Sequence, residues 1–291
     1  MSSHNELFTV QPIQPLVEMA AYESLWDQKN ATFKTIAEFF RKNKGSIPSE
    51  LVQETTFSEY LKIIKEIIAE YNVNICVYGS LEYPETLRDA KYPVEIFYYR
   101  GMLDLIHSPR RISIVGTRNP TENGKKRARK LTRLLVEDGF TIISGLARGI
   151  DTIAHKTAIE MKGKTIGVIG TPITKNYPPE NKELQEIIAK NFLLISQVPI
   201  VRYLKQNYKI NRIFFPERNK TMSALSQATV IVEAGETSGT LIQARAAIEQ
   251  GRKLFILDSC FNNNNITWPK RFEKMGAIRV KNYEDIRNGL K

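Results

Sequence analysis

Three glycine-containing segments of the chain have the composition of loops that bind anions. They span residues 116–119 (Gly-Thr-Arg-Asn), 144–151 (Ser-Gly-Leu-Ala-Arg-Gly-Ile-Asp) and 235–240 (Gly-Glu-Thr-Ser-Gly-Thr). Glycine lets the backbone approach an anion closely, and the free N–H groups at a helix start bind phosphate. One such loop is weak evidence, because a tight strand-to-helix turn needs glycine anyway. Three at corresponding strand ends favour a shared anion or nucleotide pocket. Its expected residues are Gly116, Thr117, Ser144, Asp151, Glu233, Thr237, Ser238, Gly239 and Thr240.

Some residues near this pocket have a second interpretation. Asp151 is a natural N-cap for the helix that follows it. Glu233 closes a predicted strand, where it could contact a ribose or orient the pocket. His155 lies four residues after Asp151 and could act as a base, but a hydrogen-bonded structural histidine is the simpler interpretation.

The motifs of several enzyme classes are missing. Neither GxGxxG nor GxxxxGK[ST] occurs, which disfavours a hydride-transfer enzyme and an ATPase. The two cysteines, Cys76 and Cys260, are far apart, and the histidines are His4, His107 and His155, so a disulfide framework or a metal centre has few candidate ligands. No Ser/His/Asp or Cys/His arrangement stands out. We therefore expect no catalytic residue, no metal and no cofactor.

A basic and aromatic segment spans residues 202–220. Its cationic residues are Arg202, Lys205, Lys209, Arg212, Arg218 and Lys220, and its aromatic ones are Tyr203, Tyr208, Phe214 and Phe215. Basic side chains can follow phosphates while aromatic rings stack on unpaired bases. The alternative is a surface loop whose aromatic residues fold back into the core. A second cationic ridge, formed by Lys125, Arg129 and Arg133, is equally compatible with a solvated helix face.

The net charge of +11 is unevenly distributed. Residues 1–108 contain 10 basic and 15 acidic side chains, whereas residues 109–291 contain 32 basic and 16 acidic ones. This concentration of positive charge favours a polyanionic partner, most simply nucleic acid. No apolar run is long enough to cross a bilayer, and residues 1–6 show no signal-peptide pattern. We expect a cytoplasmic protein without membrane contact.

Alternating strands and helices must position these loops, and the sequence predicts them from residue 73 onward. Strands are expected at 75–77, 95–99, 112–115, 141–144, 165–169, 193–195, 230–233, 254–257 and 279–280, and helices at 125–138, 152–161, 182–190, 223–227 and 241–250. This pattern is typical of an α/β fold with an extended Rossmann-like, doubly wound, mostly parallel sheet. Helices at 33–43, capped by Thr32, and at 58–71 predict a small helical N-terminal region. The expected division is residues 1–72 and 73–291, with a core at 109–281.

Several motifs occur together in the second part of the chain. They are Ser113-Ile-Val-Gly-Thr-Arg-Asn119, Ser144-Gly-Leu-Ala-Arg-Gly-Ile-Asp151 with Ala154-His155, Tyr177-Pro-Pro-Glu-Asn181, Phe215-Pro-Glu-Arg-Asn-Lys220, and Glu233-Ala followed by Ser238-Gly-Thr240. In this set and order the chain resembles the DNA-processing protein A family (DprA, also called Smf) over roughly residues 75–281.

The resemblance implies an extended Rossmann domain that binds single-stranded DNA without catalysis. It also implies a homodimer that helps to load a RecA-type recombinase during natural transformation or related DNA processing. By resemblance, Arg118 and residues 215–220 line the DNA groove, with residues 145–149 nearby. The residues expected to bind single-stranded DNA are Arg118, Gly145, Arg148, Gly149, Lys209, Arg212, Phe215, Arg218, Asn219 and Lys220.

The chain departs from the family pattern at several places. Gln197 stands where an acidic residue is usual, Lys220 replaces an arginine, and segment 200–214 is longer and more basic. The Pro-Gly turn after the strand at 254–257 is replaced by Asp-Ser-Cys and an asparagine run, and the sequence contains no C-terminal winged-helix domain. We expect the groove to survive these changes.

Two other functions remain open. The first is a nucleotide sensor or nucleotide-processing enzyme of the same Rossmann-like superfamily, since the pocket resembles that of the cytokinin-activating phosphoribohydrolases. The Pro-Gly-Gly of their motif is missing from residues 233–240, which argues against catalysis but not against ligand binding. The second is a scaffold whose N-terminal helices recruit a partner.

Overall fold

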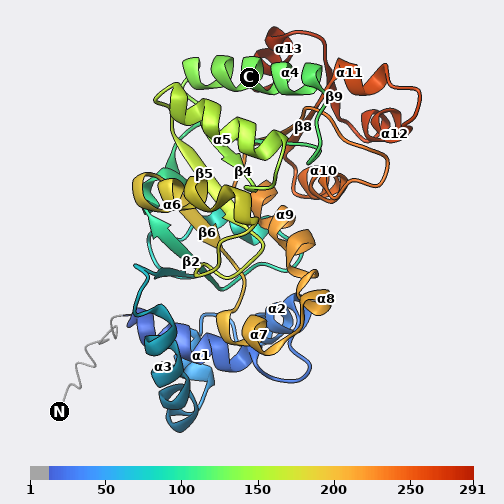
Figure 1. Ribbon diagram of the computed structural model, residues 1–291. Helices are drawn as coiled ribbons and strands as arrows, with labels where there is room; N and C mark the ends of the chain where they lie inside the picture. Colours follow the sequence, from blue (N-terminus) through green and yellow to red (C-terminus); the bar gives the residue numbers. More distant parts are fainter. Residues whose placement is uncertain (1–12) are drawn as a thin grey trace, which may run out of the picture.

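A computed structural model describes residues 13–291, so the first twelve residues of the expected N-terminal region lie outside the described residues. Within this range one nine-stranded sheet has the order β1-β2-β6-β5-β4-β3-β7-β8-β9 (Figure 1). The strands are β1 (Asn74–Val77), β2 (Ile96–Gly101), β3 (Arg111–Val115), β4 (Thr141–Ser144), β5 (Thr165–Ile169), β6 (Leu193–Ser196), β7 (Ala228–Ile231), β8 (Lys253–Leu257) and β9 (Ile278–Val280). β2 pairs antiparallel with β1 and β6, and the remaining pairs are parallel.

Helices cover both faces of the parallel part, which explains why its strands are apolar on both sides. Along β3, Ile112 and Ile114 pack against one layer and Val115 packs against the other. The first layer contains α4 (Glu122–Glu137) and α5 (Ile150–Glu160), and the second contains α9 (Phe214–Ala224) and α10 (Thr240–Glu249). α6 (Lys182–Asn191) packs near the β5–β6 end of the sheet. The predicted doubly wound, mostly parallel α/β fold is confirmed.

A helical region precedes the sheet in the chain and lies beside its β1–β2 end (Figure 1). It consists of α1 (Pro15–Trp26), α2 (Phe33–Lys42) and α3 (Glu54–Ile68). α2 is capped as predicted, since the Thr32 hydroxyl accepts from the Thr35 N–H at 3.1 Å. The sequence does not predict α1, because its residues from Glu18 to Trp26 are all buried and therefore show no amphipathic period.

A buried carboxylate connects α1 to the α/β part of the molecule. Glu23 is 0% exposed and accepts hydrogen bonds from Tyr98 Oη at 2.6 Å, Ile200 N at 2.7 Å and Val201 N at 3.0 Å. These two N–H groups open α7 (Ile200–Lys205). Burial raises the pKa of Glu23 to about 7, although its three donors favour the charged form.

The basic segment 202–220 is mostly helical rather than a surface loop. It is divided among α7, α8 (Tyr208–Asn211) and α9. Pro216 does not interrupt α9 because it lies in the first turn, where the N–H groups have no partner within the helix. The helix predicted at 223–227 is only the end of α9, which stops at Ala224, and β7 begins at Ala228, earlier than predicted.

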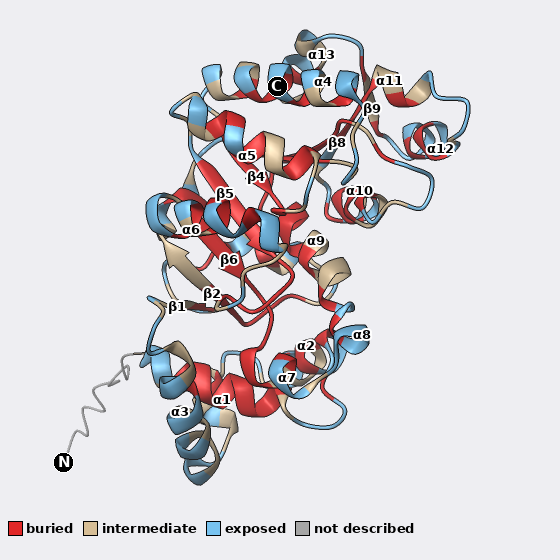
Figure 2. Cartoon of the chain, viewed as in Figure 1, coloured by how far each residue is buried: buried red, intermediate tan, exposed pale blue. Residues whose placement is uncertain are grey.

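The remaining elements are short. They are α11 (Asp258–Phe261), α12 (Trp268–Lys274), α13 (Tyr283–Gly289) and the 3-10 helices η1 (Pro48–Leu51), η2 (Glu85–Asp89), η3 (Leu103–His107) and η4 (Pro179–Asn181). Figure 2 shows the buried sheet at the centre and the exposed outer faces of α3 and α4. Among residues 13–291, no helix combines the length and apolarity needed to cross a membrane.

Candidate nucleic-acid groove

Loops at the carboxyl ends of β3, β4, β5 and β7 surround two adjoining cavities. Their volumes are ≈ 580 Å³ and ≈ 180 Å³, and both are lined by Arg118, Ala147, Phe215 and Arg218. We call these cavities together the groove. The larger one is also lined by Val115, Gly116, Thr117, Asp151, Arg212, Pro216, Asn219, Met222, Gly235, Thr237, Ser238, Gly239, Thr240, Ile242 and Gln243. The smaller one is also lined by Gly145, Arg148, Ile169, Gly170, Thr171, Tyr177, Pro178, Pro179 and Glu180. The three glycine loops singled out in the sequence therefore meet at one edge of the sheet.

Asp151 shapes the loop between β4 and α5. Its Oδ2 accepts from the N–H groups of Gly145 at 3.2 Å and Ala147 at 3.4 Å. The prediction that Asp151 caps its helix is wrong, because α5 begins at Ile150 and Gly149 occupies the N-cap position. Gly149 has a φ of +80°, and a Cβ there would lie 2.4 Å from the Thr117 carbonyl oxygen, so this turn requires glycine. Burial raises the pKa of Asp151 to about 6 despite the nearby Arg218 charge.

Arg218 lies beneath the same loop. Its side chain is buried, and Nη1 donates to the carbonyl oxygens of Gly145 and Val168, both at 2.6 Å. Nε donates to Asn219 Oδ1 at 3.0 Å. Burial lowers the pKa of this guanidinium. Arg218 therefore holds the groove wall in place, and little of it is open to a ligand.

The exposed cations of the groove are Arg118, Arg148 and Arg212. Arg148 Nη1 lies 3.5 Å from Glu180 Oε1. Neither Arg118 nor Arg212 has a carboxylate of residues 13–291 within 4 Å. These three guanidinium groups are the basic side chains of the groove that are exposed to solvent.

The aromatic residues of the basic segment have different surroundings. Tyr203 and Phe214 are buried in the core, as the alternative interpretation held. Phe215 is half-buried, lines both cavities, and has its ring centroid 5.6 Å from that of Tyr177. Tyr208 is 62% exposed on α8. Phe215 is thus the aromatic side chain of this segment that lines the groove.

A third loop forms the opposite wall and leads into α10. Ser238 Oγ accepts from Thr240 N at 3.2 Å, which shapes the turn before the helix. Asn219 Nδ2 donates to the Gly239 carbonyl oxygen at 3.0 Å, so this loop is also fixed to α9. Thr237 is exposed and Thr240 is buried. The N–H groups of Thr240, Leu241 and Ile242 are already bonded to Ser238 and Gly239, so this loop presents hydroxyl groups to the groove and not free N–H groups of a helix start.

Several predicted site residues lie outside the lining of the groove. Lys220 Nζ pairs with Glu217 Oε1 at 2.6 Å, and Lys209 is exposed on α8. The Glu233 carboxylate accepts from Thr121 N at 3.0 Å and Thr121 Oγ1 at 2.8 Å. The buried Ser144 hydroxyl donates to the Ile114 carbonyl oxygen at 2.7 Å. Gly149 shapes the turn beneath Arg118.

The groove also has a contributor that is absent from the predicted site residues, although its Tyr177–Asn181 segment is one of the motifs of the family resemblance. The loop after β5 brings Gly170, Thr171 and the Tyr177–Glu180 segment into the smaller cavity. A Cβ on Gly170 would lie 2.7 Å from the Phe215 ring, so glycine allows this ring to approach the strand end. The signals available in the sequence were this motif and Gly170, a fourth glycine directly after a predicted strand.

His155 takes no part in the groove. It is fully buried, and its Nδ1 lies 2.7 Å from Thr165 Oγ1. Burial lowers its pKa to about 3, so the ring is neutral at physiological pH. The described residues contain no group of three or more His, Cys, Asp or Glu side chains that could hold a metal ion.

A family model described as DNA recombination-mediator protein A matches residues 74–291. The chain belongs to this family. It is 36% identical over 217 residues to the DNA processing protein DprA of Bacillus subtilis, across 75% of this chain and 71% of that protein. It is 41% identical over 179 residues to the protein Smf of Synechocystis, across 60% of this chain and 44% of that protein. The match with the second relative therefore covers less than half of that relative's length.

Solved structures of DprA proteins have the same fold. The crystal structure of DprA from Streptococcus pneumoniae matches with a TM-score of 0.73 at 26% identity, across 95% of this chain and 98% of that one. DprA from Helicobacter pylori, which is described as having a unique single-stranded DNA binding mode, matches with a TM-score of 0.63 at 28% identity, across 76% and 97% of the two chains. The DprA/Smf resemblance seen in the sequence is confirmed.

Proposed function

We propose that this chain is a non-catalytic single-stranded DNA-binding protein that assists recombination. The observation that carries the proposal is the groove, in which exposed guanidinium groups and a half-buried aromatic ring meet at one edge of the sheet. Membership of a recombination-mediator family supports it.

The groove has separate features for the two parts of a nucleotide. Arg118, Arg148 and Arg212 would contact phosphates, and the ring of Phe215 would stack on a base. Lys209, Asn219 and Lys220 were also predicted to bind DNA. Asn219 lines the larger cavity, whereas Lys209 on α8 and Lys220 on α9 are outside the lining of the groove. Because stacking needs an unpaired base, duplex DNA should bind this groove more weakly.

The partners proposed from the family resemblance are a RecA-type recombinase and a second copy of this chain. The proposed setting is the cytoplasm, in natural transformation or related DNA processing. The described relatives support DNA processing and single-stranded DNA binding as the general role.

A second candidate function rests on the larger cavity. Its volume of ≈ 580 Å³, with hydroxyl groups of Thr237, Ser238 and Thr240 at its wall, suits a small nucleotide. Fluorescence anisotropy with labelled single-stranded and duplex oligonucleotides across a salt series, repeated with nucleoside monophosphates as competitors, tests both candidates. Tight single-strand binding without competition supports the DNA groove, and micromolar competition would support the nucleotide pocket.

A further inference from the structure

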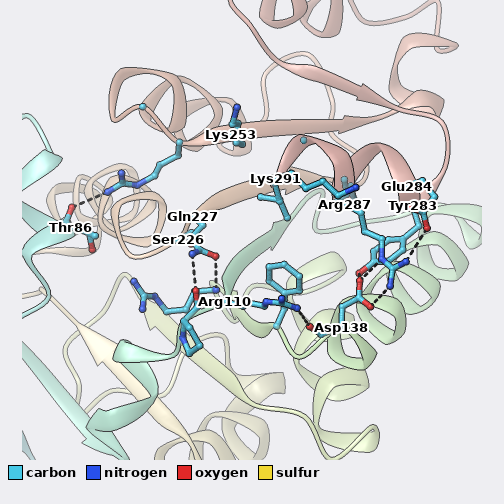
Figure 3. Close-up of a pocket in the computed structure, with 18 residues that line it drawn as sticks. Thr86, Arg110, Asp138, Ser226, Gln227, Lys253, Tyr283, Glu284, Arg287 and Lys291 are labelled. Atoms are coloured by element: carbon cyan, nitrogen blue, oxygen red, sulfur yellow. Dashed lines mark hydrogen bonds and ion pairs between the residues drawn. The ribbon is translucent and has the colours of Figure 1, made fainter.

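A second large cavity opens at the opposite, amino-terminal edge of the sheet. Its volume is ≈ 890 Å³, and it lies where β3 and β8 begin, between η2, the end of α4 and the helix α13 (Figure 3). It shares no lining residue with either cavity of the groove. A ligand held here would therefore be distinct from one held in the groove.

The lining of this cavity, which we call the amino-edge cavity, is mainly cationic. Its basic residues are Arg110, Arg111, Arg252, Lys253, Arg287 and Lys291, and its acidic residues are Asp138 and Glu284. Both carboxylates already form ion pairs with Arg287, whose guanidinium lies 2.7 Å from Asp138 and 3.2 Å from Glu284. Asp89 neutralises Arg252 at 2.5 Å.

The other cations of the cavity have no carboxylate of residues 13–291 within 4 Å. Arg111 is half-buried, and its side chain donates only to the carbonyl oxygens of Ser108 at 2.7 Å and Leu225 at 2.8 Å. Burial and the nearby Arg252 charge both lower its pKa. Like charges gathered in a partly desolvated cleft repel each other, and an external anion would relieve this repulsion.

Positive charge continues from the cavity along the outer face of α4. Lys126, Arg129, Lys130 and Arg133 are all exposed and have the i, i+3, i+4, i+7 spacing of one helix face. The salt bridges of α4 involve its other cations, Lys125 and Arg127. Glu122 and Glu137 lie four residues from Lys126 and Arg133 at the two ends of this face. Between these acids two pairs of like charges at i, i+4 remain, and such pairs destabilise a free helix.

α4 and the cavity form one end of the molecule. The Tyr283 hydroxyl of α13 donates to the Leu134 carbonyl oxygen of α4 at 3.0 Å, and Asp138, directly after α4, lines the cavity. Figure 1 shows α13 beside α4 at this end. The negative pole of the helix dipole favours cations only in the last turn of a helix. It therefore does not explain Lys126, Arg129, Lys130 and Arg133, which lie before the last turn of α4.

We propose that the amino-edge cavity and the outer face of α4 form a second DNA-binding surface, which holds the phosphate backbone of duplex DNA. This surface is independent of the groove at the opposite edge of the sheet. A protein with both surfaces would bring a single strand and a duplex together on one chain.

Duplex DNA fits this surface better than a single strand does. Phe140 is covered by the Arg110 guanidinium, 5.8 Å from its ring centroid. The Tyr283 hydroxyl is bound to Asp138 Oδ2 at 2.7 Å, with the Arg287 guanidinium 5.5 Å from the Tyr283 ring centroid. The lining therefore has cations for phosphates but no free ring for an unpaired base. Phosphate contacts of this kind do not depend on sequence.

The test compares two charge-reversal variants of the full chain. In the first, Arg129→Glu and Arg133→Glu are combined with Lys253→Glu; these side chains are exposed and form no ion pair with another described residue. In the control, Lys62→Glu, Lys65→Glu and Lys34→Glu make the same charge change on the N-terminal helices, where those residues are exposed. Anisotropy is measured with a labelled 30-bp duplex and a labelled 30-nucleotide single strand from low to moderate salt.

We expect the first variant to bind duplex about tenfold or more weakly, with the salt slope reduced by about 0.9 for each phosphate that the variant no longer neutralises. Its single-strand affinity should change by no more than that of the control. Duplex binding equal to that of the control would overturn the proposal, and so would an equal weakening of both ligands. Competition by polyglutamate as strong as by duplex would also overturn it, in favour of an acidic protein partner. An Arg118→Ala variant tests the groove separately, because it should weaken single-strand binding only.

Discussion

The guanidinium group of Arg218 donates a hydrogen bond of 2.6 Å to the carbonyl oxygen of Gly145. An α-helix on one face of the sheet is thereby joined to the loop that leaves β4 for the other face. A Cβ at Gly145 would lie 2.0 Å from Arg218 Nη1, so the two residues depend on each other. Arg218, which the family resemblance implies as a DNA-binding residue, is here a positioning residue for the groove.

Arg218→Ala should therefore destabilise the fold as well as weaken DNA binding. Removing the buried guanidinium leaves the Gly145 and Val168 carbonyl oxygens without their donor, which lowers the free energy of unfolding by about 1–3 kcal/mol. Thermal denaturation measures the first effect, and anisotropy with single-stranded DNA the second. An unchanged melting temperature in this variant would contradict the positioning role.

Arg118→Ala should weaken DNA binding without destabilising the fold. Its side chain is exposed and has no carboxylate of a described residue within 4 Å, so the melting temperature should be unchanged. Single-strand affinity should fall about tenfold, or about 1.4 kcal/mol. Lys156→Ala, on the exposed side of α5, is the matched control. If Arg118→Ala binds like this control in gel shifts and anisotropy, the groove is misplaced.

Phe215 allows stacking to be separated from charge. Phe215→Leu keeps an apolar side chain but removes the π-face, and should reduce single-strand affinity by about 1–3 kcal/mol if one base stacks there. Phe215→Tyr keeps the ring and should bind nearly as well as the unmodified chain. The salt slope should be the same in both variants, because every cation that neutralises a phosphate is still present. Equal affinities for the two variants would rule out stacking at this ring.

The protonation of Glu23 makes the free energy of unfolding depend on pH. Its pKa rises from 4.5 to about 7 on folding, so the folded state binds the proton more tightly. The stability from this group is complete below about pH 4.5 and is lost as the pH rises through 7. The change amounts to about 3 kcal/mol. Urea denaturation from pH 5 to 8 should show a falling free energy of unfolding, and Glu23→Gln should flatten that part of the profile. Parallel profiles for the two proteins would refute this role of Glu23.

The strand pattern made most of the fold predictable from the sequence. Runs such as Thr141–Ser144 and Thr165–Ile169 are apolar, short and flanked by glycine, and the structure has strands at these same residues. The three glycine loops could be placed together because parallel strands end at a common edge. α1 could not be found in this way, since burial on all sides removes the amphipathic period.

The sequence did not predict in which direction each side chain of the site points. Glu233 and Ser238 both follow β7, yet only Ser238 reaches the groove, while Glu233 turns toward Thr121. Arg218 and Lys220 are two positions apart on α9 and therefore face different directions. A motif names residues that lie close together, but the packing of the helix decides which of them meets a ligand.

The hydrogen bonds of Glu23 determine where a shortened chain could safely begin. The family match starts at residue 74, which suggests a fragment without the N-terminal helices. Such a fragment would leave the first N–H groups of α7 without their carboxylate, at the base of the segment that ends at Arg212 and Phe215. Fragments intended for crystallisation or binding studies should therefore retain α1, although it lies outside residues 74–291, which the family model matches.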